Sequence, residues 1–326
     1  MATQTRPRVL ATRRWPDAAE RRLDAHFDVV RNQSDVPLTR DELARAMREF
    51  DAIAPTITDK IDADMLAQPD RRVKIIASFG VGFEHIDVAA AKAAGVAVTN
   101  TPGVLTDATA DLALTLLLMA ARRAGEGERE LRAGKWIGWR PTHLLGHALK
   151  GRTLGLVGFG RIGQATAARA HHGFGMKIAY FARREAPTEV AGPLSAIWYP
   201  ALDDLLGIAD FVSLHVPGGA ETRHLIGAHA FEKMQPHAIL INTARGDVVD
   251  EAALVTALRE ETIGGAALDV FQGEPNVSPD LIALDKAVLL PHLGSATTET
   301  RDAMGFKVVE NLLAWFGGAT PPNRVA

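Results

Sequence analysis

The stretch from Thr153 to Gly163 has the sequence TLGLVGFGRIG and lies near the middle of a chain of 326 residues. Its apolar first half predicts a short strand, and its glycines have the spacing G-x-G-x-x-G. In a dinucleotide site the first glycine makes the tight turn, the second lets a phosphate approach, and the third lets the helix pack closely. The free N–H groups of that helix would bind the pyrophosphate. The residues of this predicted site are Gly158, Phe159, Gly160, Arg161, Ile162 and Gly163.

The composition limits the classes of protein to which the chain can belong. It is 47% hydrophobic and 23% charged, with a formal net charge of −3, so neither nucleic acid nor an anionic membrane surface is an expected partner. The chain has no cysteine, which excludes disulfides, thiolate metal sites and cysteine nucleophiles. The histidines lack metal-ligand spacing with carboxylates, and no metal is expected. The length predicts two domains.

The expected location is the cytoplasm, since a cysteine-free chain suits a reducing compartment. The first 14 residues, MATQTRPRVLATRR, contain no apolar core of a secretory signal. The longest apolar run, 112–121, has ten residues and is too short to span a bilayer. We expect it to form a buried helix.

Strand-like and helix-like segments alternate in the first hundred residues. The expected strands are 8–12, 27–30, 51–55, 73–78 and 96–99. Helices are expected at 16–25, at 39–48, near Ala63 and at 88–94, the second with Thr39 as N-cap and Glu42 completing a capping box. Such alternation predicts an α/β unit, a doubly wound parallel sheet with helices on both faces.

The alternation begins again at Arg152 and predicts a second α/β unit. The expected strands are 153–157, 177–181, 196–199, 211–216, 238–242, 265–270 and 287–291, and the expected helices are 161–172, 201–206, 250–260 and 297–316. No strand follows the last helix, which we expect to return to the first unit. The predicted domains are therefore 1–101 with 292–326, and 102–291.

The segment between the two units predicts an interface. Residues 105–123 form a long, mostly apolar expected helix, and a charged stretch, 125–135, follows it. Trp136 and Trp139 come directly afterwards, flanked by glycine and proline. Clustered aromatic residues of this kind are typical of contact surfaces, and we expect residues of about 121–147 to form a dimerisation arm.

The end of the second strand of the nucleotide unit indicates which dinucleotide binds. An NAD site carries a carboxylate here, about 20 residues after the glycines. This chain has Ala182, 19 residues after Gly163, followed by Arg183 and Arg184. The two residues could be merely solvated, but two guanidinium groups with no carboxylate would bind a 2′-phosphate. NADPH is therefore the preferred cofactor, with NADH possible.

Three strand ends of the second unit carry side chains suited to carbonyl reduction. Arg245, Glu274 and His292 follow three of its last strands, where open parallel sheets bind ligands. Each residue alone has an ordinary alternative, as a surface arginine, a turn glutamate or a core histidine. Together an arginine, a carboxylate and a histidine form a coherent set. A fourth turn, 78–82, follows a strand of the first unit, and its N–H groups could bind a carboxylate.

These motifs together resemble the D-isomer-specific 2-hydroxyacid dehydrogenases over residues 50–316. The matching segments are the glycine turn, 243–246 (TARG), 267–271 (ALDVF) with Glu274-Pro275, 291–294 (PHLG) and 79–87 (FGVGFEHID). Residues 134–141 and 182–184 are more narrowly similar to the glyoxylate/hydroxypyruvate reductases of that family. The resemblance implies a Rossmann coenzyme domain inserted in a flavodoxin-like substrate domain.

The resemblance also implies catalytic roles. His292 would donate a proton to the forming alkoxide, and Glu274 would hydrogen-bond His292 and favour its protonated form. Arg245 would bind the substrate carboxylate and polarise the carbonyl. The N–H groups of Val81 and Gly82 would hold the substrate from the other domain.

Further residues are implied in cofactor and substrate contacts. Trp139 would reach the active site of the neighbouring subunit of a homodimer and limit substrate size, or serve only as an anchor in that interface. Asp269 would face the nicotinamide carboxamide. The other implied cofactor contacts are Thr106, His215, Pro217 and Thr243. For Thr106, His215 and Pro217, a plain role in packing or in a turn is the alternative.

The implied reaction is the NADPH-dependent reduction of small 2-oxo acids, glyoxylate to glycolate and hydroxypyruvate to D-glycerate. Within the same family, a phosphoglycerate, formate or bulky 2-oxo acid dehydrogenase is an alternative. A non-catalytic dinucleotide-sensing protein is an alternative from another class, and turnover would separate it from an enzyme.

Overall fold

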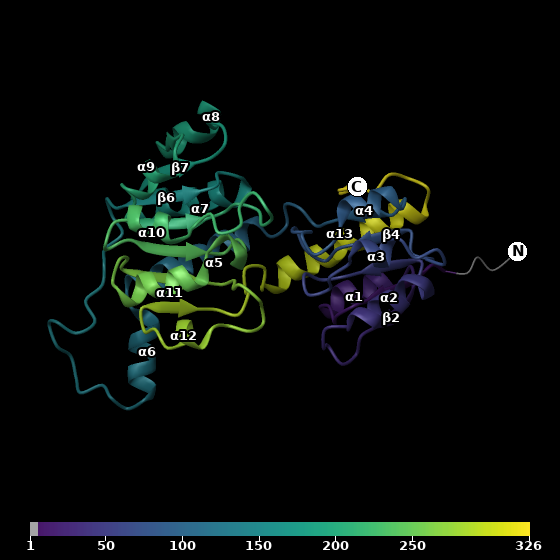
Figure 1. Ribbon diagram of the computed structural model, residues 1–326, viewed down its shortest axis with the longest axis horizontal. Coiled ribbons are helices and arrows are strands. Elements are labelled where there is room, and N and C mark those ends of the chain that lie inside the picture. The colour runs from purple at the N-terminus through teal and green to yellow at the C-terminus, as the bar shows by residue number, and fades with distance from the viewer. Residues whose placement is uncertain (1–5) are drawn as a thin grey trace, which may run out of the picture. The chain divides into compact units, whose positions relative to one another are not determined.

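The computed structural model describes residues 6–326, which divide into two compact units (Figure 1). Unit 1 contains the residues up to Leu105 together with Ser295–Ala326, and unit 2 is Thr106–Gly294. The chain thus leaves unit 1 once and returns to it for its last helix. Each unit is an α/β layer structure built on its own parallel sheet.

The sheet of unit 1 has five parallel strands in the order β2-β1-β3-β4-β5. This is the flavodoxin-like order, which confirms the fold class expected for the unit. All five expected strands are present, with ends that differ from the expected ones by no more than two residues. Their bounds are β1 Arg8–Ala11, β2 Asp28–Arg31, β3 Ala52–Ala54, β4 Ile75–Ala77 and β5 Ala97–Thr99.

Helices cover both faces of this sheet because strand side chains alternate between them. Val9 faces the core formed with α1 and α13, and its neighbour Leu10 faces the core formed with α2, α3 and α4. The expected capping box of α2 is present, with Thr39 and Glu42 bonded reciprocally. The bounds are α1 Asp17–Asp24, α2 Arg40–Glu49, α3 Ala63–Leu66, α4 Val88–Ala93 and α13 Thr298–Phe316.

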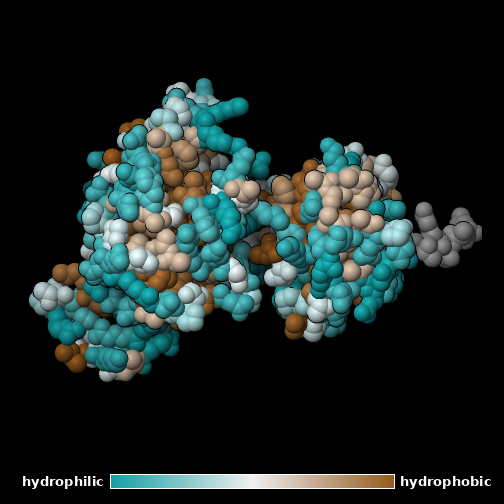
Figure 2. Space-filling view, in the orientation of Figure 1, coloured by the Kyte–Doolittle hydropathy of each residue, from teal (hydrophilic) through white to brown (hydrophobic). Residues whose placement is uncertain are grey.

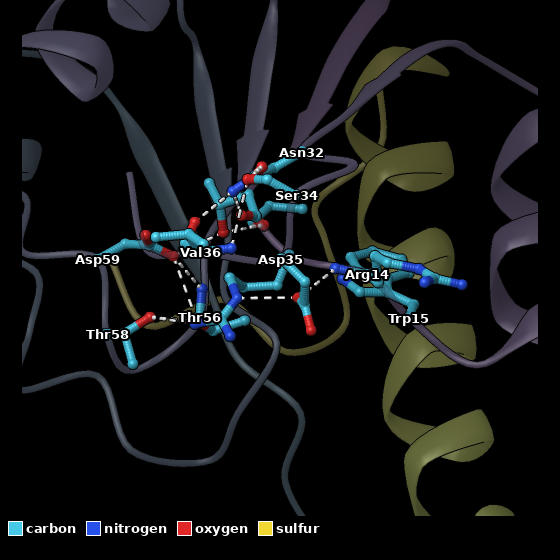
Figure 3. A network of polar contacts seen from close by, with 12 residues as sticks. Arg14, Trp15, Asn32, Ser34, Asp35, Val36, Thr56, Thr58 and Asp59 are labelled. Carbon is cyan, nitrogen blue, oxygen red and sulfur yellow. Dashed lines mark hydrogen bonds and ion pairs between the residues drawn. The ribbon is translucent and has the colours of Figure 1, made fainter. Parts of the chain in front are cut away.

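A buried polar network joins the carboxyl ends of the first three strands (Figure 3). Asp59 is fully buried and accepts hydrogen bonds from the Thr12 hydroxyl at 2.6 Å and from the Thr56 N–H at 2.7 Å. The amide of Asn32 donates to the Thr12 carbonyl at 3.0 Å. These bonds compensate the burial of the carboxylate and fix the strand ends of unit 1.

The sheet of unit 2 has seven parallel strands in the order β12-β11-β10-β9-β6-β7-β8. This is the Rossmann order with one further strand at the edge. The glycine turn follows β6, at the point where the strand order reverses. The bounds are β6 Thr153–Val157, β7 Lys177–Phe181, β8 Ile197–Tyr199, β9 Phe211–Leu214, β10 Ile239–Asn242, β11 Gly265–Leu268 and β12 Ala287–Leu289.

Two cores flank this sheet as well. One contains α5 and α7, and the other contains α9, α10, α11 and α12. Figure 1 shows these helices on either side of the strands. The bounds are α5 Thr106–Ala121, α7 Arg161–Phe174, α9 Leu202–Leu206, α10 Ala228–Lys233, α11 Glu251–Arg259 and α12 Pro279–Ile282.

Four helices of unit 2 were not expected from the sequence. The charged stretch after α5 is helical over Ala124–Arg132 (α6) despite two glycines, which are poor helix formers. The other three are α8 (Thr188–Ala191), α10 and α12, each too short to give a periodic pattern. Within residues 6–326, no helix combines the length and apolarity needed to cross a membrane.

Candidate active site

The glycine turn after β6 has the geometry of a phosphate cradle. Gly158 has φ 99°, and a Cβ there would lie 2.6 Å from the carbonyl oxygen of His215. A Cβ on Gly163 would lie 2.5 Å from the Gly158 carbonyl oxygen. A Cβ on Gly160, by contrast, would meet open space. Backbone packing therefore demands the first and third glycines, and the second leaves room beside the helix.

The start of α7 presents its backbone at this opening. Gly160 is the N-cap, and no side chain in the described part of the protein caps the helix, so its first N–H groups can bind an anion. Phe159 is buried and stacks on Tyr180 with ring centroids 4.0 Å apart. Any contact of Phe159 with a dinucleotide would therefore come from its backbone. Arg161 is exposed at the same helix start.

Two exposed cations directly follow β7. Arg183 and Arg184 are exposed and line one pocket. Arg183 lies 3.6 Å from Glu221, but both side chains are almost fully exposed, so this ion pair contributes little. The carbonyl of Ala182 accepts a hydrogen bond from the Trp198 indole at 3.1 Å, which fixes the strand end from which the arginines project.

The register of the sheet brings the ends of β10, β11 and β12 to one edge. Asn242 at the end of β10 pairs with Leu268 of β11, and Leu268 pairs with Leu289 of β12. The turns that follow these residues therefore begin side by side. They carry Arg245, Glu274 and His292, the three residues expected to be catalytic.

The turn with Arg245 is fixed by the side chain of Asn242. Its amide oxygen accepts from the Ala244 N–H at 2.9 Å, and its amide nitrogen donates to the Arg245 carbonyl at 2.8 Å. Gly246 lies directly against the next turn, because a Cβ there would be 2.0 Å from the carbonyl carbon of Phe271. The two turns are thus packed backbone against backbone.

Glu274 and His292 form a hydrogen-bonded pair. Oε2 of Glu274 lies 2.8 Å from Nδ1 of His292, and each side chain is 32% exposed. Oε1 accepts from the Phe271 N–H at 2.9 Å. Burial alone would raise the pKa of Glu274, but the hydrogen bond and charge of His292, with help from Arg245, lower that pKa. The carboxylate is therefore ionised at neutral pH, with Nε2 of His292 left to act on a ligand.

Asp269 shapes the turn that carries His292. Its two carboxylate oxygens accept from the N–H groups of Leu293 at 2.6 Å and Gly294 at 2.8 Å. His292 itself has φ 55°, a left-handed conformation that few residues other than glycine adopt. Burial raises the pKa of Asp269, and the two N–H groups oppose that rise.

Comparison with known proteins places this geometry in a family. Residues 114–294 match the model of the D-isomer specific 2-hydroxyacid dehydrogenase, NAD binding domain. The chain is 46% identical to the glyoxylate reductase of Thermococcus litoralis over 324 residues, covering 98% of this chain and 97% of the relative. The chain belongs to the D-isomer specific 2-hydroxyacid dehydrogenase family.

Other relatives agree along the whole length of this dehydrogenase. The glyoxylate reductase of Korarchaeum cryptofilum is 45% identical over 326 residues, covering 98% of this chain and 96% of its own. The NADPH-dependent glyoxylate/hydroxypyruvate reductase of Sinorhizobium meliloti, solved in complex with NADP and malonate, is 39% identical. It superposes with a TM-score of 0.85, covering 99% of this chain and 97% of its own.

The dehydrogenase is thus an NAD(P)-dependent oxidoreductase, and its unit 2 fits a nicotinamide dinucleotide. The glycine turn is shaped by backbone contacts that exclude any Cβ at two positions. The hydroxyl oxygen of Thr243, the residue directly after β10, is buried without a hydrogen-bond partner among the described residues. An orphaned buried hydroxyl suits a site that a polar ligand completes.

The remaining cofactor positions lie in the same unit. His215 follows β9, its Nε2 lies 2.9 Å from the Ser213 hydroxyl, and burial lowers the pKa of His215 to about 4. Pro217 is exposed in the same loop. Thr106 is the first residue of α5 and is half-buried. Their contacts with a dinucleotide stay predictions.

Three predicted substrate contacts lie away from these strand ends of unit 2. Val81 and Gly82 are half-buried in the turn after β4 of unit 1, where the Val81 carbonyl accepts from the Asn100 amide at 2.8 Å. Trp139 lies in the segment after α6 with 83% of its surface exposed. Figure 2 shows apolar side chains at the surface in the region of α6.

Sequence reasoning missed several residues that support the catalytic pair. Glu251 at the start of α11 is buried and accepts a hydrogen bond from the Gln272 N–H. The Gln272 amide lies 3.0 Å from Nε2 of His224. A glutamate in a first helical turn is usually exposed, so nothing in the sequence marks this one as buried. The role of the Asn242 side chain in fixing the Arg245 turn was also missed.

Proposed function

We propose that this dehydrogenase reduces glyoxylate to glycolate and hydroxypyruvate to D-glycerate with NADPH. The observation that carries the proposal is the ionised Glu274 hydrogen-bonded to His292 at 2.8 Å, beside the turn with Arg245. The glyoxylate reductases to which the chain is 45–46% identical support the substrate class. The S. meliloti relative, named for both substrates, supports hydroxypyruvate.

The proposed reaction adds a hydride and a proton across a carbonyl group. The dinucleotide supplies the hydride to C2 of the 2-oxo acid. As the C2–O bond loses its double-bond character, His292 donates the proton from Nε2 to the oxygen and becomes neutral. The ionised Glu274 on Nδ1 favours the imidazolium before transfer and holds the ring in orientation.

The 2-oxo acid needs hydrogen-bond donors for its carboxylate and for its carbonyl oxygen. We assign this role to the guanidinium of Arg245, which also opposes the negative charge that develops on the carbonyl oxygen. Unit 1 would add the N–H groups of Val81 and Gly82. On this proposal unit 2 is the dinucleotide domain and unit 1 the substrate domain, and the cytoplasm stays the expected location.

The preference for NADPH rests on the end of β7. Ala182 stands where an NAD site would carry a carboxylate, so nothing there repels a 2′-phosphate. Arg183 and Arg184 are exposed beside it and are held by no strong ion pair that phosphate would have to break. The S. meliloti relative is named NADPH-dependent.

The reaction is tested by mixing the purified protein with NADPH and either 2-oxo acid. We expect the NADPH absorbance to fall with both substrates, and faster than with NADH at equal concentration. Phosphoglycerate, formate and bulky 2-oxo acids serve as comparison substrates. No consumption of NADPH at high enzyme concentration, with the dinucleotide still bound, would instead support the sensing protein.

Replacement of Trp139 by alanine tests the arm. We propose a homodimer in which this exposed tryptophan enters the neighbouring active site and limits the size of the substrate. In Trp139→Ala, kcat/KM for a bulky 2-oxo acid should rise about 10-fold or more relative to glyoxylate, as expected when a pocket wall is removed. Trp136→Ala, a neighbouring exposed tryptophan, is the matched control.

Sedimentation shows whether each of these two variants remains a dimer. An unchanged substrate range in a dimeric Trp139→Ala would leave this residue only an anchoring role. If the wild-type protein is monomeric in solution, the arm cannot enter a neighbouring active site, and the proposed role of Trp139 is wrong.

A further inference from the structure

Glu251 is a buried carboxylate for which the proposed reaction has no use. It is the first residue of α11 and only 9% exposed. Burying a carboxylate is costly unless hydrogen bonds compensate, and the bond to this side chain comes from the Gln272 N–H. Gln272 lies two residues before Glu274 in the turn after β11. The buried charge is thus attached to the backbone that carries the catalytic carboxylate.

The turn of residues 271–274, here called the Glu274 loop, is held at each of its first two residues. The Phe271 N–H donates to Glu274 itself at 2.9 Å, which closes the loop on its own carboxylate. The Gln272 N–H donates to Glu251. Gly246 packs directly against the Phe271 carbonyl. The first contact is internal to the loop. Glu251 and Gly246 hold the loop backbone against the rest of unit 2. The side chains of Gln272 and Glu274 add contacts with His224 and His292.

The negative charge of Glu251 costs free energy in this buried position, which a residue with only a structural role would not need. Burial raises the pKa of Glu251, and the neighbouring negative charge of Glu274 raises it further. A neutral acceptor would avoid this repulsion. The N-terminal end of α11 and the Gln272 N–H partly offset the cost. Two carboxylates thus converge on one short loop, and only Glu274 meets His292.

We propose that Glu251 is a positioning residue for the reduction, which holds the Glu274 loop through the Gln272 N–H so that Glu274 meets His292. The inference rests on the proposed roles of Glu274 and His292. Without this bond the loop can move, and Glu274 orients His292 in a smaller fraction of molecules. The loss therefore falls on proton donation and not on binding of the dinucleotide.

Two conservative variants separate the hydrogen bond from the charge. Glu251→Gln keeps an oxygen that can accept from the Gln272 N–H and removes the charge. Glu251→Asp keeps the charge and shortens the side chain by one methylene, which breaks the contact. We expect kcat to fall about 10- to 100-fold in Glu251→Asp and less than about 3-fold in Glu251→Gln. The size follows the analogy with residues that orient metal ligands through hydrogen bonds. Glu260→Gln, an exposed glutamate that caps the other end of α11, is the matched control.

Measurements of binding, stability and proton transfer distinguish positioning from general support of the fold. The KM for glyoxylate and the dissociation constant for NADPH should stay near wild type in both variants. The melting temperature should stay near wild type in Glu251→Gln and fall in Glu251→Asp, whose buried carboxylate loses its hydrogen bond. The solvent deuterium isotope effect on kcat should rise in Glu251→Asp, because proton donation becomes slower relative to other steps. In a Glu274→Gln background, Glu251→Asp should add little further loss, since both changes disable the same contact.

Several results would overturn the proposal. Activity in Glu251→Asp equal to or above that in Glu251→Gln would mean that charge, not the contact, matters. Fully additive losses with Glu274→Gln, or failure of both variants to fold, would assign Glu251 to the fold alone. These outcomes differ from failure of the proposed function, in which the wild-type protein itself would not reduce glyoxylate.

Discussion

Replacing His292 by asparagine is expected to lower kcat for glyoxylate reduction by about 10²- to 10⁴-fold, the usual contribution of a positioned general acid. Asparagine lacks a group that can donate the proton to the alkoxide. It does tolerate the left-handed backbone at this position, φ 55°, better than alanine does. The loss should therefore reflect chemistry, and steady-state kinetics with both 2-oxo acids measure it.

Binding of NADPH provides the control for His292→Asn. The His292 side chain is anchored by Glu274 and its backbone N–H by the Asp269 carbonyl. The dissociation constant for NADPH, measured by fluorescence titration, should change less than about 3-fold, because no cofactor contact is assigned to this side chain. A large loss of affinity would indicate a structural role, and retained turnover would remove His292 as the proton donor.

Neutralising Arg183 and Arg184 together should reverse the cofactor preference. Each guanidinium can form charge-assisted bonds to a 2′-phosphate, and such bonds are worth about 1.5–3 kcal/mol each when well formed. Both side chains are exposed, so each bond should contribute less than that, and we expect a total loss of about 10- to 100-fold in NADPH affinity. NADH affinity should change less than about 2-fold, because NADH has no 2′-phosphate.

Arg161→Gln is the matched control for that double variant. Arg161 is also exposed, but it stands at the start of α7, where both dinucleotides would place their pyrophosphate. Its replacement should weaken NADPH and NADH by the same factor. Equal losses for both cofactors in the Arg183/Arg184 variant would contradict the assignment of these residues to the 2′-phosphate.

The strand positions and the glycine turn could be predicted because their signals are local. The five strands of unit 1 and the seven of unit 2 are apolar runs bounded by turn residues, and the structure contains all of them. The capping box of Thr39 is likewise encoded within four residues. Short helices such as α10 and α12 escaped prediction because four to six residues complete too few turns to give a periodic pattern.

The candidate catalytic residues could be proposed from strand ends but not joined into a pair. Parallel strands end at one edge of a sheet, so the sequence could predict that Arg245, Glu274 and His292 lie near one another. The 2.8 Å bond between Glu274 and His292 depends on the register of β11 with β12 and on the turn held by Asp269. Neither is visible in a linear pattern, because strand register is set by packing between distant segments.

By itself the sequence determined two α/β units, a dinucleotide turn and a strand end without the carboxylate of an NAD site. These features depend on residues close together in the chain. Only the tertiary structure decided that Asp269 bonds the His292 turn and that Glu251 is buried against the Glu274 loop. The same holds for the buried hydroxyl of Thr243, which has no partner within residues 6–326. Burial and hydrogen bonding of a polar side chain depend on which distant backbone meets it, and that is settled only when the sheet and its helices pack.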